Sequence, residues 1–187
     1  MNFSAVLLVG GESRRMRRDK ATLEWCGRPL WQWQIEKLRA ARPREILLSA
    51  RSDVAWRPAD IKLVLDVSLS RGPLSGLTAA LAAAETDHLL ALAIDMPFIT
   101  TAHLRRLCDR ATNGIGVVPM INGRAEPLCA IYPREAQAIF EQALQNDDYS
   151  LQPIVQKLIA LNLVKEISVP DAAGKIYKSV NEPQDLE

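Results

Sequence analysis

The chain is poor in cysteine and histidine and contains no long apolar run. Its 187 residues include three cysteines, which lie far apart and form no CxxC pair. This pattern indicates neither a disulfide framework nor a zinc site, and reduced thiols in a cytoplasmic location are the simple expectation. The apolar stretch within residues 1–10 is too short for a signal sequence, and the one at residues 89–94 is too short to span a bilayer. We therefore expect a soluble protein with no membrane partner.

A large excess of charge of one sign is also absent, because 23 Lys and Arg side chains are balanced by 22 Asp and Glu. Such a balance gives no overall field that would favour nucleic acid or an anionic membrane. The distribution is uneven, since residues 1–60 hold 12 basic and 7 acidic side chains. Nucleic-acid binding through the basic part would depend steeply on salt. The acidic remainder argues against it, and we expect no nucleic-acid partner.

The apolar content of 48% is enough to fill one sizeable core, and we expect a single domain over residues 1–187. Short, mostly continuous apolar runs favour strands that are buried on both faces, as in a parallel sheet. Helical spacing and capping signals separate several of these runs. The succession predicts an α/β fold with a doubly wound, mostly parallel sheet and helices on both faces. The expected strands are residues 3–9, 45–50, 61–65, 88–94 and 115–118, and the expected helices are residues 29–41, 73–85 and 100–112.

The last third of the chain is less regular. Asn122 and Gly123 form a turn signal, which predicts a hairpin whose second strand covers residues 124–132. Helices are expected at residues 133–145 and 150–160, followed by a last strand at residues 176–180. No internal repeat, low-complexity tract or linker interrupts the pattern.

The most informative segment follows the first expected strand. Gly10 and Gly11 allow a sharp turn whose backbone N–H groups suit phosphate oxygens. Five cations follow within seven positions and supply charge for a polyphosphate: Arg14, Arg15, Arg17, Arg18 and Lys20. The alternative is a solvated basic loop, but ligands of open α/β sheets bind at the carboxyl ends of strands, where this loop lies. The chain contains neither GxGxxG nor GxxxxGK[ST], which excludes a dinucleotide fingerprint and a P-loop.

Asp95 directly follows an apolar strand, with Pro97 two residues further on. A lone carboxylate at the carboxyl end of a buried strand is well placed to bind Mg²⁺, which takes few protein ligands. The alternative role for Asp95 is to cap the helix that begins near Thr100.

These motifs, in their order along the chain, resemble the signature of the molybdenum cofactor guanylyltransferases, L-A-G-G-x-S-x-R-M-G-x-D-K. The resemblance covers nearly the whole chain. The matching residues are Leu8-Val9-Gly10-Gly11, Ser13, Arg15-Met16, Asp19-Lys20, Gly27-Arg28-Pro29-Leu30, Asp66, Gly72-Pro73-Leu74-Ser75-Gly76, Asp95-Met96-Pro97, Gly123-Arg124-Ala125-Glu126-Pro127-Leu128 and Asn181-Glu182-Pro183. Two departures are Val9, where the family has Ala, and Arg17, where it has Gly.

The resemblance implies a nucleotidyltransferase fold and transfer of GMP from GTP to molybdopterin, with Mg²⁺ as cofactor and release of pyrophosphate. It implies that Arg15, Lys20 and Asp95 act in catalysis and that Asp95 and Asn181 hold the metal. The residues that it implies for nucleotide binding are Leu8, Val9, Gly10, Gly11, Ser13, Lys20, Ser49, Arg51, Asp66, Gly76 and Asp95. Molybdoenzyme maturation proteins are the implied recipients of the product.

Three alternatives remain open from the residues alone. A cytidylyltransferase for the same pterin would share these motifs, as would a transferase with a different phosphorylated acceptor. Arg17 either adds a phosphate ligand or changes the course of the loop. In the second case the chain could be a non-catalytic adaptor that binds nucleotide or cofactor.

Overall fold

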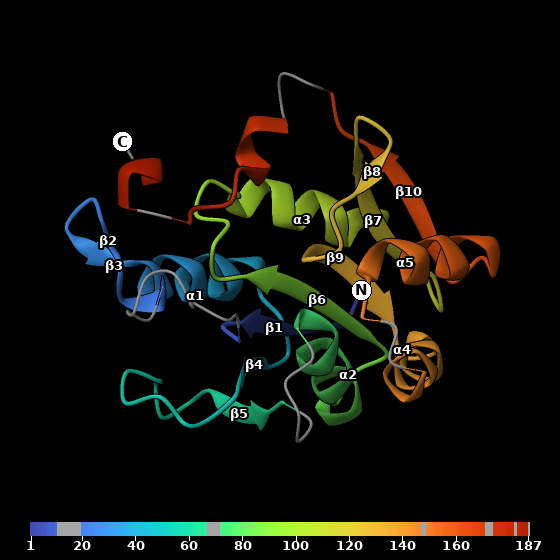
Figure 1. Ribbon diagram of the computed structural model, residues 1–187, viewed down its shortest axis with the longest axis horizontal. Coiled ribbons are helices and arrows are strands. Elements are labelled where there is room, and N and C mark those ends of the chain that lie inside the picture. The colour runs from blue at the N-terminus through green and yellow to red at the C-terminus, as the bar shows by residue number, and fades with distance from the viewer. Residues whose placement is uncertain (11–19, 67–71, 147–148, 171–173, 182, 187) are drawn as a thin grey trace.

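The computed structural model describes residues 1–10, 20–66, 72–146, 149–170, 174–181 and 183–186. Within these ranges the chain forms an eight-stranded sheet covered by helices, together with a small ribbon of β2 (Glu24–Trp25) and β3 (Arg28–Pro29) (Figure 1). Four residues with predicted roles lie outside the described ranges: Gly11, Ser13, Arg15 and Arg17.

The large sheet is mostly parallel. Its path runs through β10 (Val164–Ser168), β7 (Gly116–Ile121), β9 (Cys129–Pro133), β6 (His88–Ala93), β1 (Ser4–Leu8), β4 (Ile46–Ala50) and β5 (Lys62–Leu65). Strand β9 runs antiparallel to both β6 and β7, and β8 (Arg124–Ala125) pairs antiparallel with β7. The other pairs are parallel. Because β9 is reversed, its first residues lie at the same edge as the carboxyl ends of β6 and β1.

Burial explains why the central strands are recognisable in the sequence. Every residue of β1 and β6 is buried, since both strands have neighbours on each side and helices on each face. Strands β5 and β10 lie at the two ends of the sheet, and each has one buried residue among exposed and partly exposed ones. The predicted α/β fold with a mostly parallel sheet is confirmed.

Helices cover both faces of the sheet (Figure 1). Helices α1 (Leu30–Ala41) and α3 (Thr101–Arg110) pack into one apolar cluster. Helices α2 (Pro73–Ala83), α4 (Ala136–Gln145) and α5 (Leu151–Ala160) pack into the other. Thr100, and not Asp95, caps α3, because the hydroxyl of Thr100 accepts a hydrogen bond from the backbone N–H of His103 at 3.1 Å. Among the described helices, none combines the length and the apolar character that crossing a membrane requires.

The predictions for the last third of the chain are partly wrong. Residues 176–180 form no strand; a short 3₁₀ helix, η2 (Lys175–Tyr177), occupies part of this range, and Tyr177 and Val180 pack into the core three residues apart. The last strand is β10, whose sequence VKEIS is mostly polar and buries only Val164. The long strand expected at residues 124–132 is divided into β8 and β9, with Pro127 in the connection. The hairpin itself is confirmed, with Asn122 and Gly123 both at positive φ.

Gly116 allows β7 and β9 to approach each other closely, because it has no Cβ atom. A Cβ atom on Gly116 would collide with the backbone carbonyl oxygen of Ile131 and would lie 2.9 Å from Cδ of Pro133. We expect Gly116→Ala to lower the free energy of unfolding by about 1–3 kcal/mol, because fixed backbone must move. Chemical denaturation measures this change.

Gly174→Ala is the matched control for Gly116→Ala. The atom nearest to its added Cβ is Cγ2 of Ile121, at 3.3 Å, the end of a side chain that can shift. An unfolding free energy for Gly116→Ala equal to that of the control would contradict the described packing of β7 on β9.

Candidate functional site

The carboxyl ends of the parallel strands bring the predicted residues to one edge of the sheet. Gly10 follows β1, Asp95 follows β6, and Asp66 follows β5. A pocket of about 190 Å³ opens at this edge. It is lined by Leu8, Val9, Gly10, Lys20, Pro73, Ala93, Ile94, Asp95 and Leu128. Asp95 and four other residues that were predicted to bind nucleotide therefore line one cavity. It lies at the edge of the sheet where ligands of α/β proteins bind.

Lys20 connects three distant parts of the chain. It begins the 3₁₀ helix η1 (Lys20–Thr22), and its ammonium group lies 3.4 Å from Oδ2 of Asp95 and 2.9 Å from Oδ1 of Asn181. The side chains of Lys20 and Asp95 are partly buried, so this ion pair is less screened by solvent than one on an open surface. The structure thus places a cation between two oxygen atoms that converge on the same point.

The backbone around Asp95 is held from two directions. The C-terminal segment approaches it, because the N–H of Val180 donates to the carbonyl oxygen of Asp95 at 2.8 Å. From α1, the fully buried side chain of Gln34 donates to the carbonyl oxygens of Ala93 and Met96, each at 3.0 Å. These contacts bracket Asp95 and fix where its carboxylate emerges.

Lys37 completes the support from α1. Its ammonium group donates to Oε1 of Gln34 at 3.0 Å and to the carbonyl oxygen of Pro97. Burial lowers the pKa of Lys37 to about 8. Neither Gln34 nor Lys37 was predicted as a site residue. Their main partners are backbone carbonyls, which no side-chain motif reveals.

A second polar group lies further along the same edge, at the ends of β4 and β5. The buried hydroxyl of Ser49 donates to Oδ1 of Asp66 at 2.8 Å. The carboxylate of Asp66 lies close to two glycines, since a Cβ on Gly10 would be 2.7 Å from Oδ2 and one on Gly76 would be 3.2 Å from Oδ1. The Gly76 Cβ would also collide with Oγ of Ser49. Four predicted residues thus form one compact group, in which the glycines leave room for the carboxylate.

The structure does not bring every predicted residue together. Arg51 is exposed, follows β4 and is not among the residues that line the pocket. The positions of Gly11, Ser13 and Arg15 lie outside the described part of the chain. Their expected roles stay predictions.

The side chains available for a metal ion are few. Within the described ranges, no group of three or more His, Cys, Asp or Glu residues converges. Asp95 and Asn181 offer one carboxylate and one amide oxygen that already share a cation, the ammonium of Lys20. Two hard oxygen atoms suit Mg²⁺, which usually keeps water molecules and substrate phosphates as its other ligands. This donor set fits the metal that the sequence predicted.

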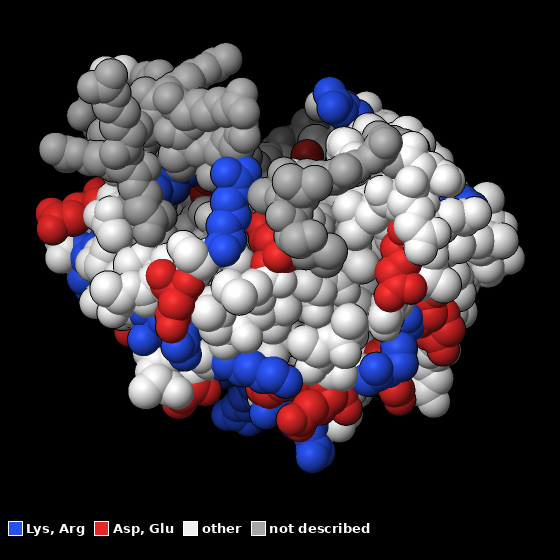
Figure 2. All heavy atoms as spheres, turned by 60° about the horizontal axis from the view of Figure 1, so that its bottom comes forward, with Lys and Arg blue, Asp and Glu red and all other residues white. Residues whose placement is uncertain are grey.

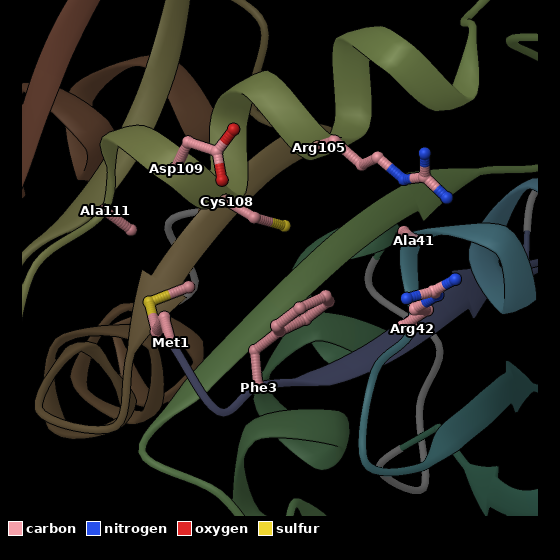
Figure 3. A pocket seen from close by; sticks show the side chains of 8 residues that line it. All are labelled: Met1, Phe3, Ala41, Arg42, Arg105, Cys108, Asp109 and Ala111. Carbon is pink, nitrogen blue, oxygen red and sulfur yellow. The ribbon is translucent and has the colours of Figure 1, made fainter.

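A larger pocket, of about 460 Å³, lies at the amino end of β1 (Figure 3). It is lined by Met1, Phe3, Ala41, Arg42, Arg105, Cys108, Asp109 and Ala111. The guanidinium of Arg105 is directed to the carbonyl oxygen of Ala40, which it contacts at 2.6 and 3.1 Å. This pocket lies away from the carboxyl ends of the strands and contains none of the predicted residues. The smaller pocket is therefore the candidate site.

The described surface charges are mixed. On the face shown in Figure 2, basic and acidic side chains outside the grey segments lie interspersed. Several charged side chains of the described residues are paired, such as Arg39 with Asp60 at 2.7 Å. On this face, the described side chains form no broad basic area of the kind that nucleic acid binds.

Comparison with known proteins identifies relatives that match nearly the whole chain. A probable molybdenum cofactor guanylyltransferase from Opitutus terrae is 35% identical over 191 residues, which cover 99% of this chain and 93% of that protein. A protein of the same description from Bacillus licheniformis is 32% identical and covers 97% and 93% of the two chains.

A solved structure shows the same fold. The crystal structure of molybdopterin-guanine dinucleotide biosynthesis protein A from Archaeoglobus fulgidus matches with a TM-score of 0.72 at 24% identity, over 98% of this chain and 94% of that one. The family model of the MobA-like NTP transferase domain matches residues 5–162. The family predicted from the motifs is confirmed: the chain belongs to the MobA-like NTP transferases.

Proposed function

We propose that this protein transfers GMP from GTP to molybdopterin and releases pyrophosphate. An oxygen of the acceptor phosphate attacks the α-phosphorus of GTP, and the bond from that phosphorus to the bridging oxygen of the β-phosphate breaks. Relatives that are described as probable molybdenum cofactor guanylyltransferases over nearly the full length of the chain support this substrate pair. The observation that carries the proposal is the convergence of Lys20, Asp95 and Asn181 beside Gly10, which follows β1.

Lys20 is proposed to hold the triphosphate and to offset charge that develops on the departing pyrophosphate. Positioning and charge neutralisation are the main demands of nucleotidyl transfer, because the reacting phosphates bring the bonds that change. Arg15 is proposed to act beside Lys20, as the motif implies. The N–H groups near Gly10 and Gly11 are proposed to bind phosphate oxygens, together with Ser13.

Asp95 and Asn181 are proposed to hold Mg²⁺, with the triphosphate supplying further oxygen ligands. When bound, the ion would neutralise phosphate charge and favour departure of pyrophosphate. Before the metal binds, the ammonium of Lys20 occupies the space between these two oxygens. We therefore propose that Lys20 moves from Asn181 toward the phosphates when GTP and the metal enter.

Asp66 is proposed to bind guanine. A carboxylate can accept hydrogen bonds from the ring N1–H and the exocyclic amine of that base, and cytosine lacks this adjacent donor pair. The hydroxyl of Ser49 holds one oxygen of Asp66 at 2.8 Å and so fixes the orientation of the carboxylate. Gly76 and Gly10 leave the space in which it lies. Arg51 is proposed to contact the nucleotide from just beyond β4.

We further propose that the reaction takes place in the cytoplasm and that molybdoenzyme maturation proteins receive the product. The three cysteines are free thiols, consistent with a reducing compartment.

The proposed reaction is tested by pyrophosphate release with molybdopterin and Mg²⁺, comparing GTP, CTP and ATP. We expect release with GTP, a product with the mass of the guanine dinucleotide, and a loss of about 100-fold or more in Asp95→Ala because a metal ligand is removed. Asp109→Ala, on the exposed side of α3, is the control and should keep full activity. A preference for CTP would identify the protein as a cytidylyltransferase. Binding of GTP without release of pyrophosphate would identify it as a non-catalytic adaptor.

Gly76→Ala tests the base site. The added Cβ would displace the Ser49 hydroxyl and press on the Asp66 carboxylate, so we expect the Kd for GTP to rise about tenfold, the loss of one well-oriented charged hydrogen bond. Equilibrium dialysis with labelled GTP measures it. The same exchange at Gly174 should leave the Kd unchanged, and a Gly76→Ala protein with normal affinity would remove Asp66 and Ser49 from the base site.

Gln34→Leu tests the support of Asp95. The exchange leaves the carbonyl oxygens of Ala93 and Met96 without their buried donor, which costs about 1–3 kcal/mol of stability. We also expect kcat to fall by about tenfold or more, because a small displacement of a metal-binding carboxylate weakens its action. Chemical denaturation measures the loss of stability, and kcat is measured under conditions in which the variant is fully folded.

The control for Gln34→Leu is Gln156→Leu on the exposed side of α5, which should change neither quantity. Normal kcat and normal Mg²⁺ dependence in folded Gln34→Leu would show that α1 does not position Asp95.

A further inference from the structure

Glu126 lies close to the candidate site in the chain, and the proposed function assigns it no role. It belongs to the connection between β8 and β9, two residues before Leu128, which lines the same pocket as Asp95. The N–H of Ala93 donates to the carbonyl oxygen of Leu128 at 2.9 Å, so this connection is joined to the end of β6. Because β9 is antiparallel to β6, its first residues lie at the edge where the reaction is proposed to occur.

The carboxyl group of Glu126 is half-buried and makes no hydrogen bond with another residue in the described ranges. Burial raises its pKa, and the charge of Arg124 opposes this effect. Burial raises the pKa of Tyr177, and Cys129 and then Glu126 add to this effect. The hydroxyl of Tyr177 is already bonded to the imidazole of His103.

A half-buried carboxylate without a donor costs free energy, and a ligand with N–H groups would relieve that cost. The order of the strands places Glu126 and Asp66 on opposite sides of Asp95. Asp66 follows β5, at one end of the sheet, whereas Glu126 precedes β9, the neighbour of β6 on the other side. If the base of the nucleotide lies over Asp66 and the reacting phosphates over Asp95, the acceptor extends toward Glu126.

We propose that Glu126 binds the pterin of the acceptor through the 2-amino-4-oxo-pyrimidine edge of that ring. This edge carries a ring N–H next to an exocyclic amine, the same donor pair that guanine offers to Asp66. A carboxylate accepts both bonds with the charge-assisted strength of such pairs. The inference rests on the proposed function, since it takes molybdopterin as the acceptor, and it makes Glu126 a residue for acceptor specificity.

The experiment compares the wild-type protein with Glu126→Gln, which keeps the size of the side chain but replaces one acceptor oxygen with a donor. We expect the KM for molybdopterin to rise about tenfold or more, the Kd for GTP to stay unchanged and kcat to change by less than about threefold. Glu126→Asp keeps the charge on a shorter side chain and should give an intermediate KM. Glu135→Gln, the same exchange at the exposed residue before α4, is the control and should match the wild type.

A direct binding measurement separates this inference from the proposed reaction. Fluorescence titration with unsubstituted pterin, in the absence of GTP and Mg²⁺, should show binding that Glu126→Gln weakens and Glu135→Gln does not. An unchanged KM for molybdopterin in Glu126→Gln, or an equal weakening of GTP binding, would overturn the role of Glu126. Failure of the wild-type protein to form the guanine dinucleotide would instead overturn the proposed function.

If Glu126→Gln fails to fold, as judged by its thermal unfolding, Glu126→Asp decides the outcome on the same two readouts. A normal KM for molybdopterin together with normal pterin binding in that variant would count against the inference.

Discussion

The contact of one ammonium group with two oxygen atoms determines how the candidate site is built. Lys20, Asp95 and Asn181 come from the start, the middle and the end of the chain, and no local structure holds them together. The pairing of β1 with β6 brings Gly10 to the same pocket as Asp95. Asn181 lies beside Lys20 because Tyr177 and Val180 are buried and the N–H of Val180 donates to the backbone carbonyl oxygen of Asp95. The apolar packing of the C-terminal segment is thus a precondition for the polar arrangement.

The burial of each strand determined whether it could be predicted from the sequence. The central strands were recognisable because both of their faces are covered, so SAVLL and HLLALA read as continuous apolar runs. Strand β10 was not predicted because it lies at an end of the sheet, buries only Val164 and has a mostly polar sequence. The apolar residues between 176 and 180 suggested a strand, yet their spacing of three also suits a short helical turn. Here a local pattern was compatible with two structures, and the packing against α3 decided between them.

The candidate site could be predicted only where its members follow a motif. Lys20, Asp95 and Asn181 lie in short, ordered patterns at the ends of elements, and the structure brings them together. Gln34 lies in the middle of α1 and donates to backbone carbonyls of Ala93 and Met96. Every residue type has such carbonyls, so the sequence carries no trace of the pairing. Glu126 was visible in a motif, but only the antiparallel direction of β9 shows that the connection before this strand lies at the reactive edge.

That reversal also explains why the two halves of the site differ in chemistry. On the side of β1, β4 and β5, each parallel strand ends at the reactive edge, where Gly10 and Gly76 leave room for the carboxylate of Asp66. On the other side of β6, strand β9 begins at that edge, and the hairpin connection before it presents side chains. Backbone N–H groups suit phosphates, which every nucleotide carries, whereas side chains can differ between relatives without altering the sheet. An antiparallel strand next to β6 therefore lets the acceptor side change in specificity while the nucleotide side keeps its geometry.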